Sequence, residues 1–391
     1  MKKIKLGDAC EILNGFAFKS ENYVGSGIRV IRISNVQKGY IEDNTPAFYP
    51  LETKGLEKYM LEEGDLLISL TGNVGRVAIL EKEFMPAALN QRVACLRLKT
   101  DKLSKRYLFH ILNSDFFEKQ CIQYSKGVAQ KNMSTAWLKD YEILLYSKEQ
   151  QELIADILDK MHLIKKLRYY ELQKLDELVK ARFVEMFGDP NIEFKYSSVK
   201  FNDLVARMTK GPFGSDMKKD LFVPKGEDTY KVYIQINAIQ KNQSLGEYYI
   251  SKEYFDRKVS RFELFPNDYI ITCDGTLGKY LKLDENMEKG VISPSLLRLT
   301  LQNDKINDKY FENIWDFYML GLMKKEARNA CLVHLPSAKK IGEILIPVPP
   351  LELQNQFASF VEEVDKSRSR IQKSLEASQE LFDSLMQEYF G

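Results

Sequence analysis

Two glycine-rich turns carry polar residues that are well placed for recognition chemistry. Residues 71–75, Thr-Gly-Asn-Val-Gly, lie between two strand-like patterns and are followed by Arg76. Residues 274–278, Asp-Gly-Thr-Leu-Gly, lie between two further strand-like patterns and are followed by Lys279. A tight turn projects short polar side chains from a sheet, and the basic residue beside it can meet a phosphate or a guanine edge. The same turns are also ordinary hairpin connections, and both interpretations hold.

The chain lacks the sequence motifs of the common catalytic sites. Residues 275–279 come nearest to a phosphate-binding loop but lack its spacing and its hydroxyl. We find no Gly-x-Gly-x-x-Gly fingerprint, no Asn-Pro-Pro-Tyr or Asp-Pro-Pro-Tyr methyltransferase motif, and no carboxylate-plus-lysine nuclease cluster. The histidines have no metal-ligand spacing, and five scattered cysteines indicate reduced thiols. The sequence therefore predicts no catalytic, cofactor or metal site in this chain.

Composition indicates a globular protein with more than one core. The chain has 391 residues, of which 44% are hydrophobic, and a formal net charge of +2. No apolar run is long enough to cross a bilayer, and Asp8 precedes any signal-like apolar stretch. We therefore expect a soluble cytoplasmic protein. The charge neither demands nor excludes a polyanionic partner, so an argument for DNA has to come from the architecture.

The chain contains a long internal repeat. Residues 63–75 correspond to residues 266–278 at a displacement of 203, and the same displacement relates residues 90–92 to 293–295 and Gln151 to Gln354. Only the start slips, with residues 4–8 matching 199–203 at a displacement of 195. A repeat of this size is too long for a solenoid period and suits a whole domain with its connector. The sequence therefore predicts two copies of one folded unit, with two like sites.

Each copy begins with strand patterns and continues with helix, which predicts a mixed α/β or α+β fold. The predicted strands of the first copy are 28–33, 65–70, 77–80 and 93–98, and those of the second are 230–236, 268–272, 280–283 and 296–301. A helical stretch follows the strands in each copy, near 105–124 and 308–326.

The second half of each copy predicts one long amphipathic helix. Apolar residues recur at three- and four-residue steps through residues 149–187 and 352–390, and each segment of 39 residues would extend about 58 Å as a helix. If the two copies are related by a pseudo-two-fold axis, the helices run antiparallel as a coiled coil with a globular domain at each end. Such a rod would hold two recognition heads at a fixed separation.

Several motifs together resemble the specificity (S) subunit of Type I restriction-modification systems over essentially the full chain. They are Lys-Leu-Gly-Asp at 5–8, Gly-Asp-Leu-Leu at 64–67 with the turn at 71–75, Asn-Gln-Arg-Val at 90–93, and the segments 127–134, 334–337 and 346–354. The chain departs from the family pattern at residues 146–148, which lack the usual prolines, and at residues 293–295, Ser-Pro-Ser.

The resemblance implies two target-recognition domains, at residues 1–147 and 191–350, each reading half of a bipartite, asymmetric double-stranded DNA site. Helical regions at 148–190 and 351–391 would set the unread gap and dock the modification subunits, which are two in number. Catalysis would then belong to partners. The modification subunits would bind S-adenosylmethionine and methylate adenine N6 on a flipped base, and restriction subunits would add cleavage driven by ATP and Mg²⁺. This chain would hold no cofactor.

Candidate DNA-facing residues follow from the turns and the matched segments. In the first domain they are Lys19, Thr71, Asn73, Arg76, Asn90, Gln91, Arg92, Lys131 and Asn132; in the second they are Lys210, Thr276, Lys279, Ser293, Ser295, Arg328 and His334. The copies keep their glycines but exchange these polar residues, which favours two heads reading different sequences, although drift on exposed loops would look the same. The alternative hypothesis is a coiled-coil scaffold whose two heads bind proteins.

Overall fold

The computed structural model describes residues 2–125, 132–240, 246–329 and 334–390, with the backbone alone at 237 and 327–329. The chain forms two compact units. Unit 1 comprises Met1–Tyr170 with Gln372–Gly391, and unit 2 comprises Glu171–Ile371. Each unit therefore contains one head together with a part of each long helix.

The head of unit 1 is built from three small sheets. A four-stranded antiparallel sheet has the order β2-β8-β5-β6, a three-stranded sheet has the order β4-β3-β7, and β1 pairs with β9. The strands are β1 (Lys2–Lys5), β2 (Cys10–Asn14), β3 (Ile28–Ile31), β4 (Phe48–Tyr49), β5 (Leu66–Ser69), β6 (Val77–Ile79), β7 (Ala87–Leu89), β8 (Val93–Leu98) and β9 (Glu142–Leu145).

The four-stranded sheet separates two hydrophobic cores because side chains alternate along its strands. On β5, Leu66 and Ile68 join the core beneath the helices, whereas Leu67 points to the core shared with the three-stranded sheet. The helices of this head are α1 (Leu6–Ala9), α2 (Lys105–Leu112), α3 (Asp115–Tyr124) and α4 (Thr135–Asp140). The helical stretch predicted near 105–124 is present but divided in two, because Ser114 caps a new helix by accepting a hydrogen bond from Phe117 N at 3.1 Å.

Unit 2 repeats this architecture, which confirms the predicted duplication of a mixed α/β domain. Its sheets have the orders β11-β17-β14-β15 and β13-β12-β16, and β10 pairs with β18. The predicted strand at 230–236 ends at Tyr233, because residues 235–238 form a helical turn. The elements are β10 (Ser198–Lys200), β11 (Val205–Lys210), β12 (Thr229–Tyr233), α6 (Gln235–Ala238), β13 (Tyr248–Ser251), α7 (Lys252–Tyr254), β14 (Tyr269–Thr272), β15 (Tyr280–Lys282), β16 (Gly290–Ile292), β17 (Leu296–Leu301), α8 (Asp308–Ile314), α9 (Leu320–Asn329), α10 (Ala338–Gly342) and β18 (Leu345–Pro347), with π-helical turns at Phe255–Val259 and Trp315–Met319.

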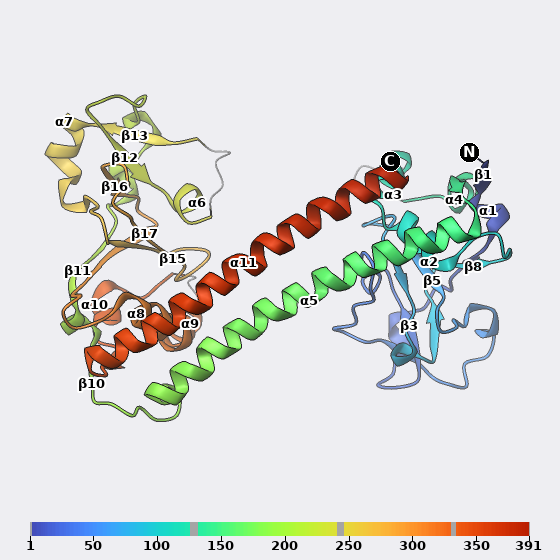
Figure 1. Cartoon of the computed structure of the whole chain (residues 1–391), viewed down its shortest axis with the longest axis horizontal. Coiled ribbons are helices and arrows are strands. Elements are labelled where there is room, and N and C mark those ends of the chain that lie inside the picture. The colour runs from blue at the N-terminus through green and yellow to red at the C-terminus, as the bar shows by residue number, and fades with distance from the viewer. Residues whose placement is uncertain (1, 126–131, 241–245, 330–333, 391) are drawn as a thin grey trace. The chain divides into compact units, whose positions relative to one another are not determined.

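Two 40-residue helices, α5 (Lys148–Phe187) and α11 (Leu351–Phe390), follow the heads, and both match the predicted bounds within one residue (Figure 1). Gly188 ends α5 with φ +88°, a conformation that glycine adopts without strain. The helices run antiparallel in unit 2, where the rings of Phe183 and Phe357 lie 5.6 Å apart and Asp176 pairs with Arg368. The predicted two-fold relation between the units stays a prediction.

A buried glutamine joins each head to the first turn of its long helix. Gln151 is fully buried; its Oε1 accepts from Ser104 N at 2.8 Å, and its Nε2 donates at 2.9 Å to the carbonyl oxygens of Lys102 and Tyr146. Gln354 is also fully buried and repeats the arrangement, with Oε1 accepting from Asn307 N at 2.8 Å. Its Nε2 donates to Pro349 O at 2.8 Å and Lys305 O at 3.3 Å. In each unit, the same two loops of the head are thus hydrogen-bonded to the first turn of the long helix that follows it.

Candidate nucleic-acid interface

Strand register brings the candidate loops of unit 1 to one edge of the four-stranded sheet. Asn14 at the end of β2 pairs with Ala94, Ser69 at the end of β5 pairs with Val93, and Ile68 pairs with Val77 at the start of β6. The chain therefore leaves or enters all four strands at the same edge. The loop after β2, the turn between β5 and β6, and the loop before β8 converge there. Together they carry the predicted residues Lys19, Thr71, Asn73, Arg76, Asn90, Gln91 and Arg92.

The sheet of unit 2 builds the same edge. Lys210 at the end of β11 pairs with Leu297, Thr272 at the end of β14 pairs with Leu296, and Ile271 pairs with Tyr280. The loops that meet there carry Lys210, Thr276, Lys279, Ser293 and Ser295. Thr276, Lys279, Ser293 and Ser295 are therefore equivalent to Asn73, Arg76, Asn90 and Arg92 in structure as well as in sequence.

A buried hydroxyl holds each turn in shape. Ser69 Oγ donates to the carbonyl oxygen of Asn73 and accepts from Arg76 N at 3.0 Å. In unit 2, Thr272 Oγ1 donates to the carbonyl oxygen of Thr276 and accepts from Lys279 N at 3.0 Å. Both hydroxyl-bearing residues are fully buried. The hydroxyl thus fixes the backbone from which Asn73 and Thr276 project into solvent.

The last glycine of each turn is required by conformation and by space. Gly75 has φ +82° and Gly278 has φ +75°, both in the left-handed region that disfavours other residues. A Cβ on Gly75 would lie 2.8 Å from the side chain of Cys121, and one on Gly278 would lie 2.3 Å from Leu320 Cδ1. The turns are therefore pressed against the helices behind them, α3 in unit 1 and α9 in unit 2.

A second segment pairs with each turn along the backbone. In unit 1, Met133 N donates to Leu70 O at 2.8 Å, and Thr71 forms a bridge with Asn132, whose side chain is exposed. In unit 2, Leu335 N donates to Cys273 O at 2.8 Å, and the ring of His334 is hydrogen-bonded to Asp274. The backbone pairing therefore brings Asn132 and His334 to the two edges, and their contact with DNA stays a prediction. Lys131 lies outside the described residues, as does the side chain of Arg328.

The candidate side chains differ in how firmly they are held. Arg76 Nη1 donates to Gln37 Oε1, so its guanidinium is oriented by a neighbouring loop. The side chain of Asn90 accepts from Arg92 N at 3.2 Å, while Gln91 and Arg92 are exposed. Lys19 is exposed and its ammonium lies 3.8 Å from Glu21. The first edge therefore combines one oriented arginine with several adaptable polar side chains.

In unit 2, Lys210, Thr276, Lys279 and His334 are exposed, but Ser293 is not. Ser293 is 5% exposed, its N–H donates to Tyr233 O at 3.0 Å, and its hydroxyl lies 3.3 Å from that of Ser295. Ser293 therefore supports the loop from below, and the half-buried Ser295 lies closer to solvent.

Sequence reasoning missed the contribution of the three-stranded sheet. β3 and β7 run parallel with Ile31 opposite Leu89, so the chain after β3 arrives at the same edge as Asn90. This loop supplies Gln37, the partner of Arg76, and Ile33, which packs beside Gly72. In unit 2, Gln235 lies beside Gly275 in the same way. Ile33 and Gln235 are 202 residues apart, close to the repeat displacement of 203. This correspondence could have identified the loops after β3 and β12 as part of the two edges.

The described part of the chain contains no group of three or more His, Cys, Asp or Glu side chains that could hold a metal ion. Burial raises the pKa of the Cys10, Cys121 and Cys273 thiols to about 12, so these groups are neutral and poor nucleophiles at pH 7.

Over the described residues, no helix has the length and apolar character needed to span a membrane. The arrangement offers hydrogen-bond donors and acceptors on two rigid edges.

Comparison with known proteins connects this geometry to one family. The family model for the Type I restriction modification DNA specificity domain matches residues 1–176 and 214–379. The EcoBI specificity subunit of a Type I restriction enzyme from Escherichia coli is 24% identical over 412 aligned residues, covering 95% of this chain and 81% of that protein. The MjaVIII specificity subunit of Methanocaldococcus jannaschii is 28% identical over 184 residues, but this match spans only 43% of its length.

Solved structures share the fold. The S subunit of a Type I restriction-modification system from M. genitalium aligns with a TM-score of 0.57 and 15% identity, over 100% of this chain and 96% of that one. A chain from a structural study of complex assembly in the type I R-M system aligns with a TM-score of 0.60 and 14% identity, over 100% and 97%. At these identities the likeness establishes the architecture of two α/β heads with long helices.

Proposed function

We propose a mode of DNA reading from the premise that this chain belongs to the Type I restriction modification DNA specificity family. The chain is a non-catalytic subunit that recognises a DNA sequence. Each unit presents one sheet edge to the DNA, and each edge reads one half of a split target. The observation that supports this is the register of the two four-stranded sheets, which gathers the polar loops at one edge in both units.

Arg76 is our candidate for direct base reading in unit 1. An arginine that donates in bidentate fashion to guanine O6 and N7 needs a fixed orientation, and the hydrogen bond to Gln37 supplies it. Lys279 occupies the equivalent place in unit 2 and is exposed. A flexible ammonium there suits a phosphate, which positions the protein without reading sequence. We therefore infer a guanine in the half-site read by unit 1.

The other polar groups differ between the units in the bases they suit. Asn73, Gln91 and Asn132 expose amide side chains on the first edge, and amides pair well with adenine N6 and N7. The second edge offers the hydroxyls of Thr276 and Ser295 and the ring of His334. Two different half-sites, and hence an asymmetric target, follow from this difference.

The first part of α5 offers a surface for a protein partner. Leu153, Leu163, Ile164 and Leu167 are 60%, 54%, 39% and 50% exposed. At a helical period of 3.6 residues these positions fall on one face. The residues of α11 that correspond to them at the repeat displacement of 203 are polar or charged, namely Gln356, Lys366, Ser367 and Arg370. The apolar face is therefore present on α5 and not on α11.

We infer that this face helps to dock one modification subunit, because large apolar side chains in water commonly mark an interface. Two such subunits would bind this chain, and restriction subunits would join the assembly. S-adenosylmethionine, ATP and Mg²⁺ would bind to those partners and not to this chain, and the complex would act in the cytoplasm.

Methylome mapping tests the proposal. Co-expression of this chain with its modification subunit in a methylation-free host should yield N6-methyladenine in a split, asymmetric motif with a fixed gap. Replacing residues 1–147 by the corresponding domain of a relative should change one half of the motif and leave the other unchanged. A motif with both halves preserved would refute the assignment of half-site reading to unit 1.

Two point variants separate base reading from phosphate contact. Arg76→Ala should relax one base position in one half-site, with discrimination falling by about 1–3 kcal/mol. Lys279→Ala should weaken binding to all sequences alike and reduce the salt slope by about one. Equal weakening of all sequences by Arg76→Ala would show that Arg76 contacts only phosphate. Binding that is insensitive to salt in the wild-type chain would instead favour the protein-binding scaffold.

A further inference from the structure

Each unit contains a groove between its head and the two long helices, and the two grooves occupy repeat-equivalent positions. The first encloses about 470 Å³ and the second about 310 Å³. A displacement of 203 residues converts Lys165, Phe382 and Asn113 of the first groove into Arg368, Val179 and Asp316 of the second. A surface that is duplicated in this way suits a partner that binds twice through the same element.

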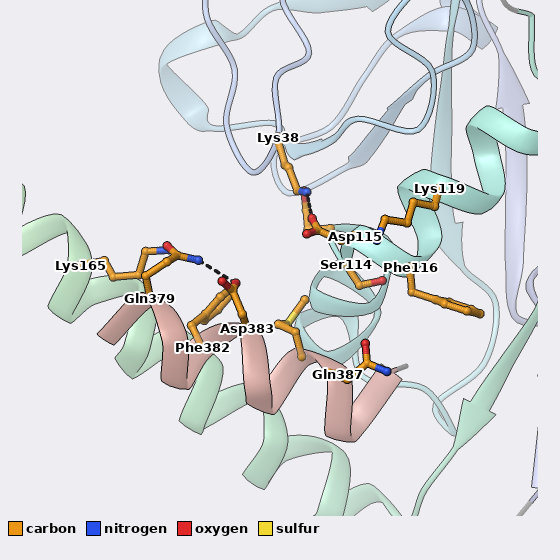
Figure 2. Close-up of a pocket in the computed structure, with 12 residues that line it drawn as sticks. Lys38, Ser114, Asp115, Phe116, Lys119, Lys165, Gln379, Phe382, Asp383 and Gln387 are labelled. Atoms are coloured by element: carbon orange, nitrogen blue, oxygen red, sulfur yellow. Dashed lines mark hydrogen bonds and ion pairs between the residues drawn. The ribbon is translucent and has the colours of Figure 1, made fainter. Parts of the chain in front are cut away.

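Two of the three lysines that line the first groove form no ion pair with the residues that the structure describes (Figure 2). Lys38 pairs with Asp115 and lies 2.9 Å from Glu118. Lys119 and Lys165, in contrast, have no carboxylate within ion-pairing distance among the residues that the structure describes. The Lys165 ammonium lies 4.6 Å from the centre of the Phe382 ring, and burial lowers its pKa, with the Asp383 carboxylate opposing that shift. An incoming carboxylate would therefore satisfy a half-buried charge here.

The two cations of the second groove are already paired with carboxylates of the same groove. Arg368 lies 2.7 Å from Asp176, and Lys309 lies 3.0 Å from Glu312 and 3.4 Å from Asp365. The Tyr280 hydroxyl donates to Asp316 at 3.1 Å. Four carboxylates thus line this groove against two cations, whereas three lysines line the first groove against two carboxylates. The grooves share their position in the repeat but not their charge.

A nucleic acid does not suit both grooves, because four carboxylates in the second would repel a phosphate backbone. The first groove also places the 44%-exposed ring of Phe116 and the side chains of Phe382 and Met386 beside its lysines. Apolar side chains mixed with a few charges are typical of a protein interface.

We propose that the two grooves receive the same element of two modification subunits, and that this element presents a carboxylate which pairs with Lys119 and Lys165 in the first groove only. The inference rests on the proposed docking of modification subunits. It follows that the two copies bind unequally. The copy at unit 1 binds more tightly at low salt, and this advantage shrinks as salt screens its ion pairs.

Native mass spectrometry of the full chain with its modification subunit, over a series of salt concentrations, tests the inference. The double variant Lys119→Met, Lys165→Met keeps the aliphatic contacts and removes both charges. We expect its first modification subunit to bind roughly 2- to 30-fold more weakly at low salt, from two ion pairs at about 0.2–1 kcal/mol each. Lys160→Met, Lys166→Met, two exposed lysines of α5 outside the groove, is the matched control and should bind like wild type. Lys119→Arg, Lys165→Arg should also bind like wild type.

Unchanged affinity and salt dependence in the double methionine variant would overturn the inference. So would a loss of DNA affinity with modification-subunit binding intact, because the lysines would then belong to a DNA contact. The absence of any complex with the wild-type chain would refute the proposed docking itself, and is therefore distinguishable from failure of the groove assignment.

Discussion

Replacing Gln151 by leucine should weaken the junction between the head of unit 1 and its long helix. The side chain makes three hydrogen bonds in a site that is fully buried, one from Ser104 N and two to carbonyl oxygens. Leucine fills similar space but can neither accept nor donate. The perturbation therefore leaves the polar groups of two loops without their partner.

The size of the effect depends on which of those groups can reach water. Ser104 is 2% exposed, so its N–H would be left unsatisfied at a cost of about 1–3 kcal/mol. Lys102 is exposed and Tyr146 is half-buried, so water can replace part of what their carbonyl groups lose. We expect the free energy of unfolding of unit 1 to fall by about 2–4 kcal/mol, a melting-temperature decrease of roughly 5–15 °C.

Calorimetry and hydrogen exchange of the full chain measure this effect. Gln151→Leu should lower one unfolding transition and raise amide exchange in residues 102–104, whereas Gln354→Leu should act on unit 2 in the same way. Gln356→Leu is the matched control, because Gln356 lies on the same helix as Gln354 but is exposed. If Gln151→Leu melted within 2 °C of the control, roughly the shift expected from less than 1 kcal/mol, the hydrogen bonds would not be what holds the junction.

Three further perturbations follow from the same structure. Ser69→Ala should leave Arg76 N without its acceptor and destabilise the turn by about 1–3 kcal/mol. It should weaken binding to the half-site of unit 1 and spare binding to that of unit 2, which titration with DNA carrying one intact half-site would measure. Gly75→Ala should lower the melting temperature more than Gly72→Ala, because both have positive φ but only a Cβ at Gly75 would lie 2.8 Å from Cys121; equal effects would refute the packing argument. Burial lowers the pKa of His110 below its ordinary 6.5, with Asp159 opposing, so His110 takes up a proton in the unfolded chain before it does in the folded one as pH falls. Denaturant titration should therefore show unit 1 losing stability below about pH 6.5, and His110→Gln should flatten that dependence on pH.

The long helices were predictable because their signals are local. A 3.6-residue apolar period, a glycine at 188 and prolines at 349 and 350 can be read without knowledge of any distant residue. The break at Ser114 was missed because apolar residues continue across it, and only the capping hydrogen bond to Phe117 N separates the two helices.

The interface was predictable only in part because its construction is non-local. The repeat identified both turns, but their meeting with the loop before β8 depends on pairing β2 with β8 across some 80 residues of chain. Gln37 escaped notice because its partner, Arg76, lies 39 positions away. Ser293 was placed among the candidates because the repeat aligns it with Asn90, whereas its N–H donates to Tyr233 O and its side chain is buried.

The pattern of what the two units keep and what they change has a physical explanation. Both units keep a buried hydroxyl, at Ser69 or Thr272, and a glycine with positive φ, at Gly75 or Gly278. These two features set the backbone conformation of the turn. The side chains that the turns carry face solvent and contribute little to folding, so each can change to suit a different base without cost to the sheet. Under the proposed function, a duplicated scaffold with variable edges would therefore read two unlike half-sites, and a single fold would produce an asymmetric target.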